Sequence, residues 1–374
     1  MEDRGHGLVR RWVVDNKRQM CTLHAALCVI TQRSAMNVTI MNFEKRMDRV
    51  WMQVLLYVRV FGFGVVLLQV FAVDHRMLIP LAVAINSTLF HSRNPDRLHI
   101  HIMLPRDKPL PKDTDLDSYF KTVLAGRSAK LEVHLVDVSH IVAKMRVNFH
   151  GYGPSKDYLK SELNYVRFEL QSLLPNVSKV IYLDPDVVVQ ADVEELWETA
   201  LPHGSKFALA AVQRRRSSHW FGNPTFKGML NFKDPQIAQL FAPDELYFNA
   251  GVFVANLDKW RELDLSTRMV RWLSINAERN IYQFGSQPPM NMVFYRDYQK
   301  LPDEWNRPMG TSGGGDAELK EGRTNDDLYV QSGKILHWSG NRKPWVKGQG
   351  RYSKVWHRYI HDAEKIRQYT TINV

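Results

Sequence analysis

The chain has 374 residues, which is enough for one large α/β domain or two ordinary domains. Its formal net charge is +11 at pH 7, so the expected partners are anionic: nucleotide phosphates, acidic glycans or membrane surfaces. The basic residues are scattered and form no block interleaved with aromatic side chains, so we expect no nucleic-acid binding. With two cysteines in the whole chain, a disulfide framework is excluded as the support of the core.

Residues 1–62 have no clear periodicity and form a poorly defined N-terminal region, suited to a targeting signal or a membrane anchor. Residues 50–73 carry one charge, Arg59, and follow a basic stretch, as in an anchor whose basic end faces the cytoplasm. Against this, a charged side chain near the middle of a span is costly. Residues 65–73 also have the pattern of a buried strand, and one segment cannot serve both purposes.

From residue 65 onward, short β-branched runs alternate with helical patterns. Such alternation predicts an α/β domain in which a mostly parallel sheet is covered by helices on both faces. In chain order we predict a strand at 65–73, a helix at 80–90 that begins with Pro80, strands at 98–104 and 131–138, an amphipathic helix at 158–174, a strand at 180–183, a short helix after Asp192, strands at 207–212 and 247–256, a helix at 258–278, a glycine-rich loop at 310–334 and a final strand at 335–338.

Two histidines lie on the strand predicted at 98–104. The two-residue period of a strand places His99 and His101 on the same face. This arrangement suits either a metal-binding pair or the more common case of hydrogen-bonded histidines.

The most informative stretch is the strand at 180–183 and the acidic turn that follows it. Pro185 cannot donate to a sheet ladder, so the strand should end between Asp184 and Asp186. The two carboxylates then lie at the carboxyl end of a buried strand, where open α/β sheets bind their ligands. Because bare carboxylates cannot be buried, these two must meet water, a cation or a hydrogen-bond donor. We interpret them as the ligands of a divalent cation that carries a nucleotide diphosphate. The other Asp-x-Asp pairs, within 113–117, lie in a proline-rich polar segment and are expected to be solvated.

Three motifs occur in order: Tyr-Leu-Asp-Pro-Asp at 182–186, Phe-Asn-Ala-Gly-Val at 248–252 and His-Trp-Ser-Gly-Asn-Arg-Lys-Pro-Trp at 337–345. Together they resemble glycosyltransferase family 8, which includes glycogenin, bacterial lipooligosaccharide galactosyltransferases, plant galacturonosyltransferase-like proteins and animal family-8 domain-containing proteins. The resemblance implies a GT-A fold, a Rossmann-like nucleotide-diphospho-sugar transferase domain, over residues 63–360. Residues 361–374 would then be a C-terminal tail.

The resemblance also implies an activity, namely transfer of a hexose or hexuronic acid from a UDP-sugar to a glycan or glycoconjugate acceptor with retention of configuration. It implies Mn²⁺ held by Asp184, Asp186 and His337, and a mixed oxygen and nitrogen ligand set suits this ion. Asp184, Asp186 and Gln287 are the predicted catalytic residues, although Gln287 would otherwise be an ordinary loop residue. The predicted donor-binding residues are Ala72, Val73, Asp74, Arg167, Asp184, Asn249, Gly340 and Lys343.

Several of these residues have simpler interpretations. Asp74 could cap the helix that follows it, Arg167 and Lys343 could be surface cations, and Asn249 could belong to an ordinary turn. Arg214, Arg215 and Arg216 follow the strand at 207–212 and form either a solvated basic loop or a reader of a sugar carboxylate.

Two other classes of function are compatible with the sequence. One is a catalytically inactive family member that binds a nucleotide or glycan as a scaffold. The other is a basic membrane-binding or nucleic-acid-binding protein, which only the net charge favours. For an active enzyme, the resemblance implies the Golgi or ER lumen and a single-pass anchor near the N-terminus. Asn37, Asn86 and Asn176 begin glycosylation triplets.

Overall fold

The computed structural model describes residues 67–106, 115–145, 161–215, 224–283, 285–309, 324–340, 343–346 and 352–360. The predictions for residues 1–62 and 361–374 lie outside these ranges. Within them, no helix is both long and apolar enough to cross a membrane. The second half of the candidate anchor forms the buried strand Leu67–Ala72, so an anchor over the whole of 50–73 is wrong.

A seven-stranded sheet forms the centre of the domain, in the order β3-β2-β1-β4-β7-β6-β8. Among the described strands of this sheet, β7 runs antiparallel to both of its neighbours, and the other pairs are parallel. The mostly parallel sheet predicted from the alternating pattern is therefore confirmed. Its strands are β1 (Leu67–Ala72), β2 (Leu98–Pro105), β3 (Lys130–Val136), β4 (Lys179–Leu183), β6 (Leu209–Gln213), β7 (Phe248–Asn256) and β8 (Gln299–Lys300).

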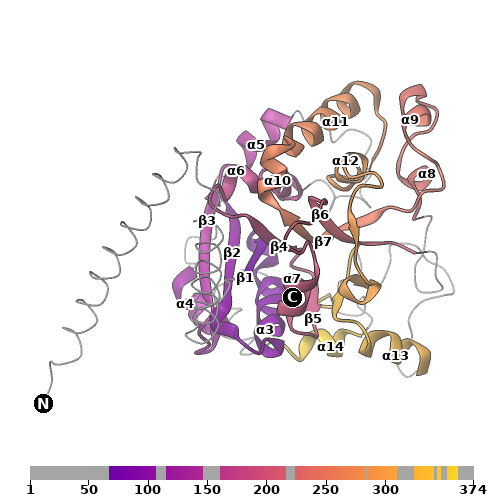
Figure 1. Cartoon of the computed structure of the whole chain (residues 1–374). Helices are drawn as coiled ribbons and strands as arrows, with labels where there is room; N and C mark the ends of the chain where they lie inside the picture. Colours follow the sequence, from indigo (N-terminus) through magenta and orange to yellow (C-terminus); the bar gives the residue numbers. More distant parts are fainter. Residues whose placement is uncertain are drawn as a thin grey trace, which may run out of the picture. The chain divides into compact units, whose positions relative to one another are not determined.

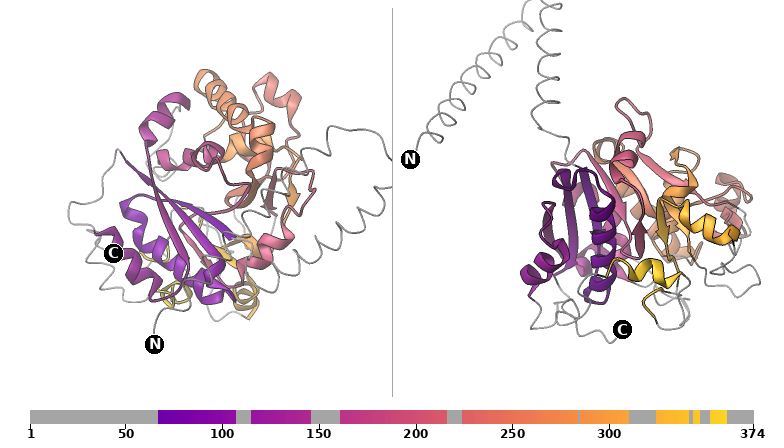
Figure 2. Two further views of the ribbon diagram at one scale, coloured as in Figure 1. Left: turned by 60° about the vertical axis from the view of Figure 1, so that its left-hand side comes forward. Right: turned by 90° about the horizontal axis from the view of Figure 1, so that it is seen from below.

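The sheet separates two hydrophobic cores, because neighbouring residues of a buried strand point to opposite faces. On β1, Phe71 belongs to one core and Val70 to the other, and helices cover both faces (Figures 1 and 2). The first core receives residues from α3 (Leu78–His91), α4 (Leu116–Leu124), α7 (Val193–Thr199), α13 (Thr324–Gln331) and α14 (Ser353–His357), and the second from α5 (Val138–Met145), α6 (Leu170–Leu173), α8 (Phe226–Met229), α9 (Pro235–Leu240), α10 (Leu257–Glu262), α11 (Leu265–Arg279) and α12 (Gln287–Val293).

A second, three-stranded sheet has the order β5-β10-β9. Its strands are β5 (Val187–Val189), β10 (Ile335–His337) and β9 (Arg307–Pro308). β10 runs antiparallel to β5, with His337 paired to Val187. Because β5 begins directly after Asp186, this pairing brings the C-terminal histidine to the acidic turn.

Three predicted elements differ from the structure. The helix predicted at 158–174 is replaced in its described part by the 3₁₀ helix η4 (Glu162–Phe168) and the short α6. Most residues of η4 are buried, and Arg167 is among them. The helix predicted at 258–278 is broken into α10 and α11 at Asp264, whose φ is 48°. The predicted loop at 310–334 contains α13, which the apolar Val330 ties to the core.

The other short 3₁₀ helices connect longer elements. They are η1 (His75–Met77), η2 (Pro95–Arg97) and η5 (Asp303–Asn306).

One glycosylation triplet falls inside α3, where Asn86 is buried and donates a hydrogen bond to the backbone oxygen of Tyr359. Asn86 is therefore inaccessible to modification in the folded domain.

Candidate active site

The acidic turn after β4 is fixed to both sheets by its backbone. The amide of Asp184 donates to the carbonyl oxygen of Gly251 on β7 at 2.7 Å. The carbonyl oxygen of Asp186 accepts from the amide of Trp338, directly after β10, at 3.0 Å. The turn is thus held between two strands from distant parts of the chain, and its carboxylates have defined positions.

Three predicted metal ligands converge at this turn. The Nε2 atom of His337 lies 3.2 Å from Oδ1 of Asp186 and 4.0 Å from Oδ2 of Asp184. One ligand atom from each residue lies within 4.8 Å of the other two. The structure therefore brings together groups that are more than 150 positions apart in the sequence.

The tautomer of His337 follows from its neighbours. Arg214 donates to Oδ1 of Asn306 at 3.3 Å, and since a guanidinium has only donors, that amide atom must be the oxygen. The same Oδ1 lies 3.0 Å from Nδ1 of His337, so the ring proton sits on Nδ1. The lone pair of Nε2 then faces the two carboxylates, as metal-bound histidines require.

The site fits a divalent cation for two reasons. Three electron-rich atoms face one another across it, which is unfavourable unless a cation lies between them. In addition, the buried Oδ1 of Asp186 accepts no well-aligned hydrogen bond from the described residues. Burial alone would raise the pKa of Asp186, but the positive charge of Lys343 outweighs it and holds that pKa well below its usual range. The carboxylate is therefore ionised at neutral pH and available to a metal.

Lys343 lies beside the acidic turn. Its Nζ atom donates to Oδ2 of Asp186 at 2.5 Å and to the backbone oxygen of Trp338 at 2.8 Å, so it is not a free surface lysine. Gly340 precedes it with a φ of 113°, a conformation that side-chain-bearing residues avoid. This glycine turns the chain after β10 so that Lys343 reaches back to the site.

Arg167 is buried and does not lie on the surface. It donates to Oδ1 of Asp184 at 3.0 Å and to the backbone oxygen of Ala250 at 2.5 Å. Its guanidinium lies over the ring of Tyr182, 4.8 Å from the centroid. In this structure Arg167 fixes one oxygen of Asp184.

Asn249 and Gln287 are joined to the same network. The Oε1 atom of Gln287 accepts from Nδ2 of Asn249 at 3.1 Å and from the amide of Ala250 at 3.3 Å. The Oδ1 atom of Asn249 accepts from Nδ2 of Asn306 at 3.2 Å. Gln287 is the first residue of α12, so it is positioned by a helix and by the site, unlike an ordinary loop residue.

The remaining predicted donor-binding residues lie at the end of β1. Ala72, Val73 and Asp74 are buried there, and β1 pairs with β4, which leads to Asp184. Asp74 accepts a hydrogen bond from the amide of Arg76 and caps η1. The capping interpretation therefore describes Asp74 in this structure, one strand away from the acidic turn.

Arg214 contradicts the prediction of an arginine-rich loop. It is buried, and its Nη1 and Nη2 atoms both donate to Asn306. The solvated-loop interpretation is therefore wrong for this arginine, while Arg215 is exposed and Arg216 lies outside the described residues. Sequence reasoning also missed Asn306, because no local pattern links this residue to His337.

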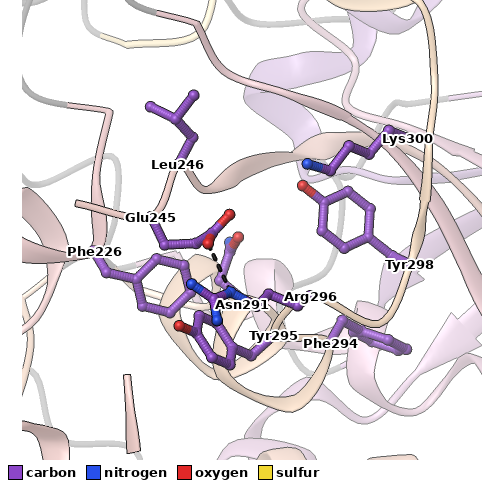
Figure 3. Close-up of a pocket in the computed structure, with 9 residues that line it drawn as sticks. All are labelled: Phe226, Glu245, Leu246, Asn291, Phe294, Tyr295, Arg296, Tyr298 and Lys300. Atoms are coloured by element: carbon purple, nitrogen blue, oxygen red, sulfur yellow. Dashed lines mark hydrogen bonds and ion pairs between the residues drawn. The ribbon is translucent and has the colours of Figure 1, made fainter. Parts of the chain in front are cut away.

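A cavity of about 240 Å³ lies next to β6 and β8 (Figure 3). Figure 3 shows Tyr298 and Lys300 with their polar ends toward one another, and Arg296 pairs with Glu245 at 2.7 Å. None of the predicted site residues lines it. One of its lining residues, Asn291, lies one turn beyond Gln287 on α12 and accepts from the amide of Phe248.

We expect Asn306→Ala to weaken metal binding about 10- to 100-fold, the usual effect of losing the hydrogen-bond partner of a ligating histidine. Asn306→Asp keeps an acceptor for Nδ1 of His337 but removes the donor to Asn249, so it should retain most of the metal affinity. Calorimetric Mn²⁺ titration measures both, with the exposed Asn176→Ala as control. Equal affinity in Asn306→Ala and the control would show that Asn306 does not orient the histidine.

Comparison with known proteins agrees with this geometry. The model of "Glycosyl transferase family 8" matches residues 69–348. The chain is 33% identical over 213 residues to "Glycosyltransferase 8 domain-containing protein 1" of Danio rerio, covering 54% of this chain and 56% of that protein. It is 30% identical over 276 residues to "Probable galacturonosyltransferase-like 7" of Arabidopsis thaliana, covering 73% and 69%. The chain thus spans about half the length of its animal relatives.

Solved structures share the fold. The WbbM bifunctional glycosyltransferase has a TM-score of 0.60 at 22% identity, covering 83% of this chain and 53% of that one. The galactosyltransferase LgtC, solved with donor and acceptor sugar analogues, has a TM-score of 0.54 at 20% identity, covering 82% and 98%. These similarities confirm the GT-A fold. With the matched family model covering most of the chain, the protein belongs to glycosyltransferase family 8.

Proposed function

We propose that this family member is a Mn²⁺-dependent, retaining enzyme that transfers a hexose or hexuronic acid from a UDP-sugar to a glycan or glycoconjugate. The observation that carries the proposal is the convergence of Asp184, Asp186 and the Nε2 lone pair of His337. Lys343 adds a cation beside the same point. A nucleotide diphosphate, with its several negative charges, is the ligand that such a site would complement.

The chemistry of the site agrees with loss of a diphosphate leaving group. A bound divalent ion would neutralise the negative charge that develops on that group without any proton transfer. Two carboxylates and one imidazole form a mixed oxygen and nitrogen set, which favours Mn²⁺ over Ca²⁺. Lys343 would bind the diphosphate, and Arg167 would hold Asp184 in its ligating orientation.

The configuration of the anomeric carbon is retained in one of two ways. Either the acceptor attacks from the same face of the donor sugar from which the leaving group departs, or a covalent intermediate forms. Gln287 is the predicted residue beside the reacting carbon, and an amide is a poor nucleophile. We therefore favour same-face attack, in which Gln287 positions the donor sugar. Its Oε1 atom is already occupied by Asn249 and Ala250, which leaves its amide nitrogen for the sugar.

A panel of UDP-sugars tests the donor. The Arabidopsis relative is named for galacturonosyl transfer and the LgtC structure for galactosyl transfer, so both sugars belong in the panel. UDP release should be measured with UDP-glucose, UDP-galactose, UDP-xylose and UDP-galacturonate, with and without Mn²⁺. We expect one donor to be hydrolysed slowly in a Mn²⁺-dependent manner.

The alternatives give different results in this experiment. UDP binding that needs Mn²⁺ but produces no turnover with any donor would support an inactive scaffold. Binding that ignores Mn²⁺ and weakens steeply with salt would support a charge-driven membrane or nucleic-acid protein. We further propose residence in the Golgi or ER lumen with an anchor near the N-terminus, to be tested by protease protection of the full chain in microsomes.

A further inference from the structure

A cluster of imidazoles lies on the sheet away from the acidic turn. His99 and His101 are on β2, and Glu132 and His134 are on the edge strand β3. Paired strands keep register neighbours on the same face, and His101 is paired with Glu132. All four side chains therefore lie on one face of the sheet edge.

The four side chains contact one another directly. His99 Nε2 lies 2.9 Å from Glu132 Oε2, and His101 Nδ1 lies 2.8 Å from His134 Nε2. The rings of His99 and His101 are 4.1 Å apart between centroids, at 32°. His99, His101 and Glu132 each offer a ligand atom within 4.8 Å of the other two.

One nitrogen in this cluster has no partner among the residues that the structure describes. His101 is 3% exposed, and its buried Nε2 atom makes no hydrogen bond within the described part of the chain. Leaving a buried polar atom unsatisfied is costly. If Nδ1 of His101 donates to His134, Nε2 presents a bare lone pair, which is the form that binds a metal.

We propose that His99, His101 and Glu132 form a second metal site, selective for an imidazole-binding cation such as Zn²⁺. His134 holds His101 in the ligating tautomer and is a positioning residue. Two imidazoles and one carboxylate are a common zinc ligand set that leaves a fourth position for water. Ligand atoms around a tetrahedral zinc stand about 3.3 Å apart, so small side-chain rotations would close the site.

This site is separate from the acidic turn. His101 is paired with Val70 of β1, and Val70 is paired with Tyr182 of β4. The cluster therefore lies two strands, or about 10 Å, from the strand that leads to Asp184. The Glu132 side chain is 42% exposed, which gives an ion access. Zinc would join the edge strand to its neighbour and raise the stability of the sheet edge.

The test is a zinc titration of the untagged full chain with saturating Mn²⁺ present, so that the acidic site is occupied. Competition with a chromogenic chelator gives the stoichiometry, and thermal unfolding gives the stabilisation. We expect one tightly bound zinc and a rise in Tm of several degrees. His101→Phe should abolish both, and Glu132→Gln, at the exposed rim, should weaken zinc binding at least 10-fold even if His101→Phe fails to fold.

Two further variants separate ligation from general effects. His134→Gln should weaken zinc binding roughly 10- to 100-fold by releasing His101. His357→Ala, which removes an exposed histidine bonded to its own helix, should leave binding unchanged. The proposal would be overturned if the Glu132→Gln and His134→Gln variants bound zinc as tightly as the wild-type chain. UDP release plays no part in these measurements, so the result is independent of the proposed enzymatic activity.

Discussion

Asp186→Asn is expected to abolish Mn²⁺-dependent UDP release, lowering the rate by roughly 10³-fold or more. The substitution keeps the size of a buried side chain but removes the charge that faces His337 and Lys343. A ligating carboxylate supports several kcal/mol of charge stabilisation on the leaving group, and each 1.36 kcal/mol is a tenfold change in rate. The rate is measured as UDP release with the preferred donor, and Mn²⁺ affinity by calorimetry.

The matched control is Asp96→Asn. It removes the same charge from an exposed carboxylate on η2, so any general effect of net charge appears in both variants. Circular dichroism should show that both proteins are folded. If Asp186→Asn kept its Mn²⁺ affinity and its activity within a few-fold of the control, the metal role of the acidic turn would be refuted.

Gly251→Ala is expected to eliminate metal binding although it replaces none of the predicted metal ligands. A Cβ atom at this position would lie 2.4 Å from Oδ2 of Asp184 and 2.4 Å from Cε1 of His337. Both groups would have to move, and a displacement of about 1 Å at a catalytic site costs on the order of 100-fold in rate. The overpacking itself should lower the free energy of unfolding by about 1–3 kcal/mol. Calorimetry and UDP release measure the first effect, and thermal unfolding the second.

Gly333→Ala is the control for overpacking. Its Cβ would lie 2.6 Å from a side-chain atom of Leu336 and 2.8 Å from one of Arg307, so it also crowds the small sheet. It should lose stability but keep its Mn²⁺ affinity. A Gly251→Ala protein that binds Mn²⁺ as tightly as Gly333→Ala would show that the acid and histidine have more freedom than the structure gives them.

Local sequence was sufficient for the strands of the main sheet other than β8, and for the acidic turn. The run ending at Leu183 has no polar alternation, and Pro185 breaks it, so a buried strand with two carboxylates at its end was predictable. The apolar run of β1 likewise ends just before Asp74, so this strand was predictable in the same way. These features depend on neighbours within a few residues of one another.

Other features depend on tertiary contacts that no local pattern reveals. Asn306 contacts His337 because β9, directly after Asn306, pairs with β10. Arg214, directly after β6, reaches the histidine only through Asn306, to which it donates. The residues of η4 have helical apolar spacing, yet they form a 3₁₀ helix in which Arg167 is buried against Asp184. Because Arg214 begins a run of three arginines, its local sequence indicates a solvated loop. Only the folded structure shows that this arginine is buried.

The pairing of β5 with β10 has a consequence for refolding. His337 lies opposite Val187, and a slip of one residue would place Leu336 or Trp338 there and turn the imidazole to the other side of the ribbon. A cation that needs the imidazole and both acids therefore binds only chains that have paired these strands correctly. Manganese added during renaturation would therefore stabilise only the chains with the native strand register, and the yield of correctly folded protein should rise.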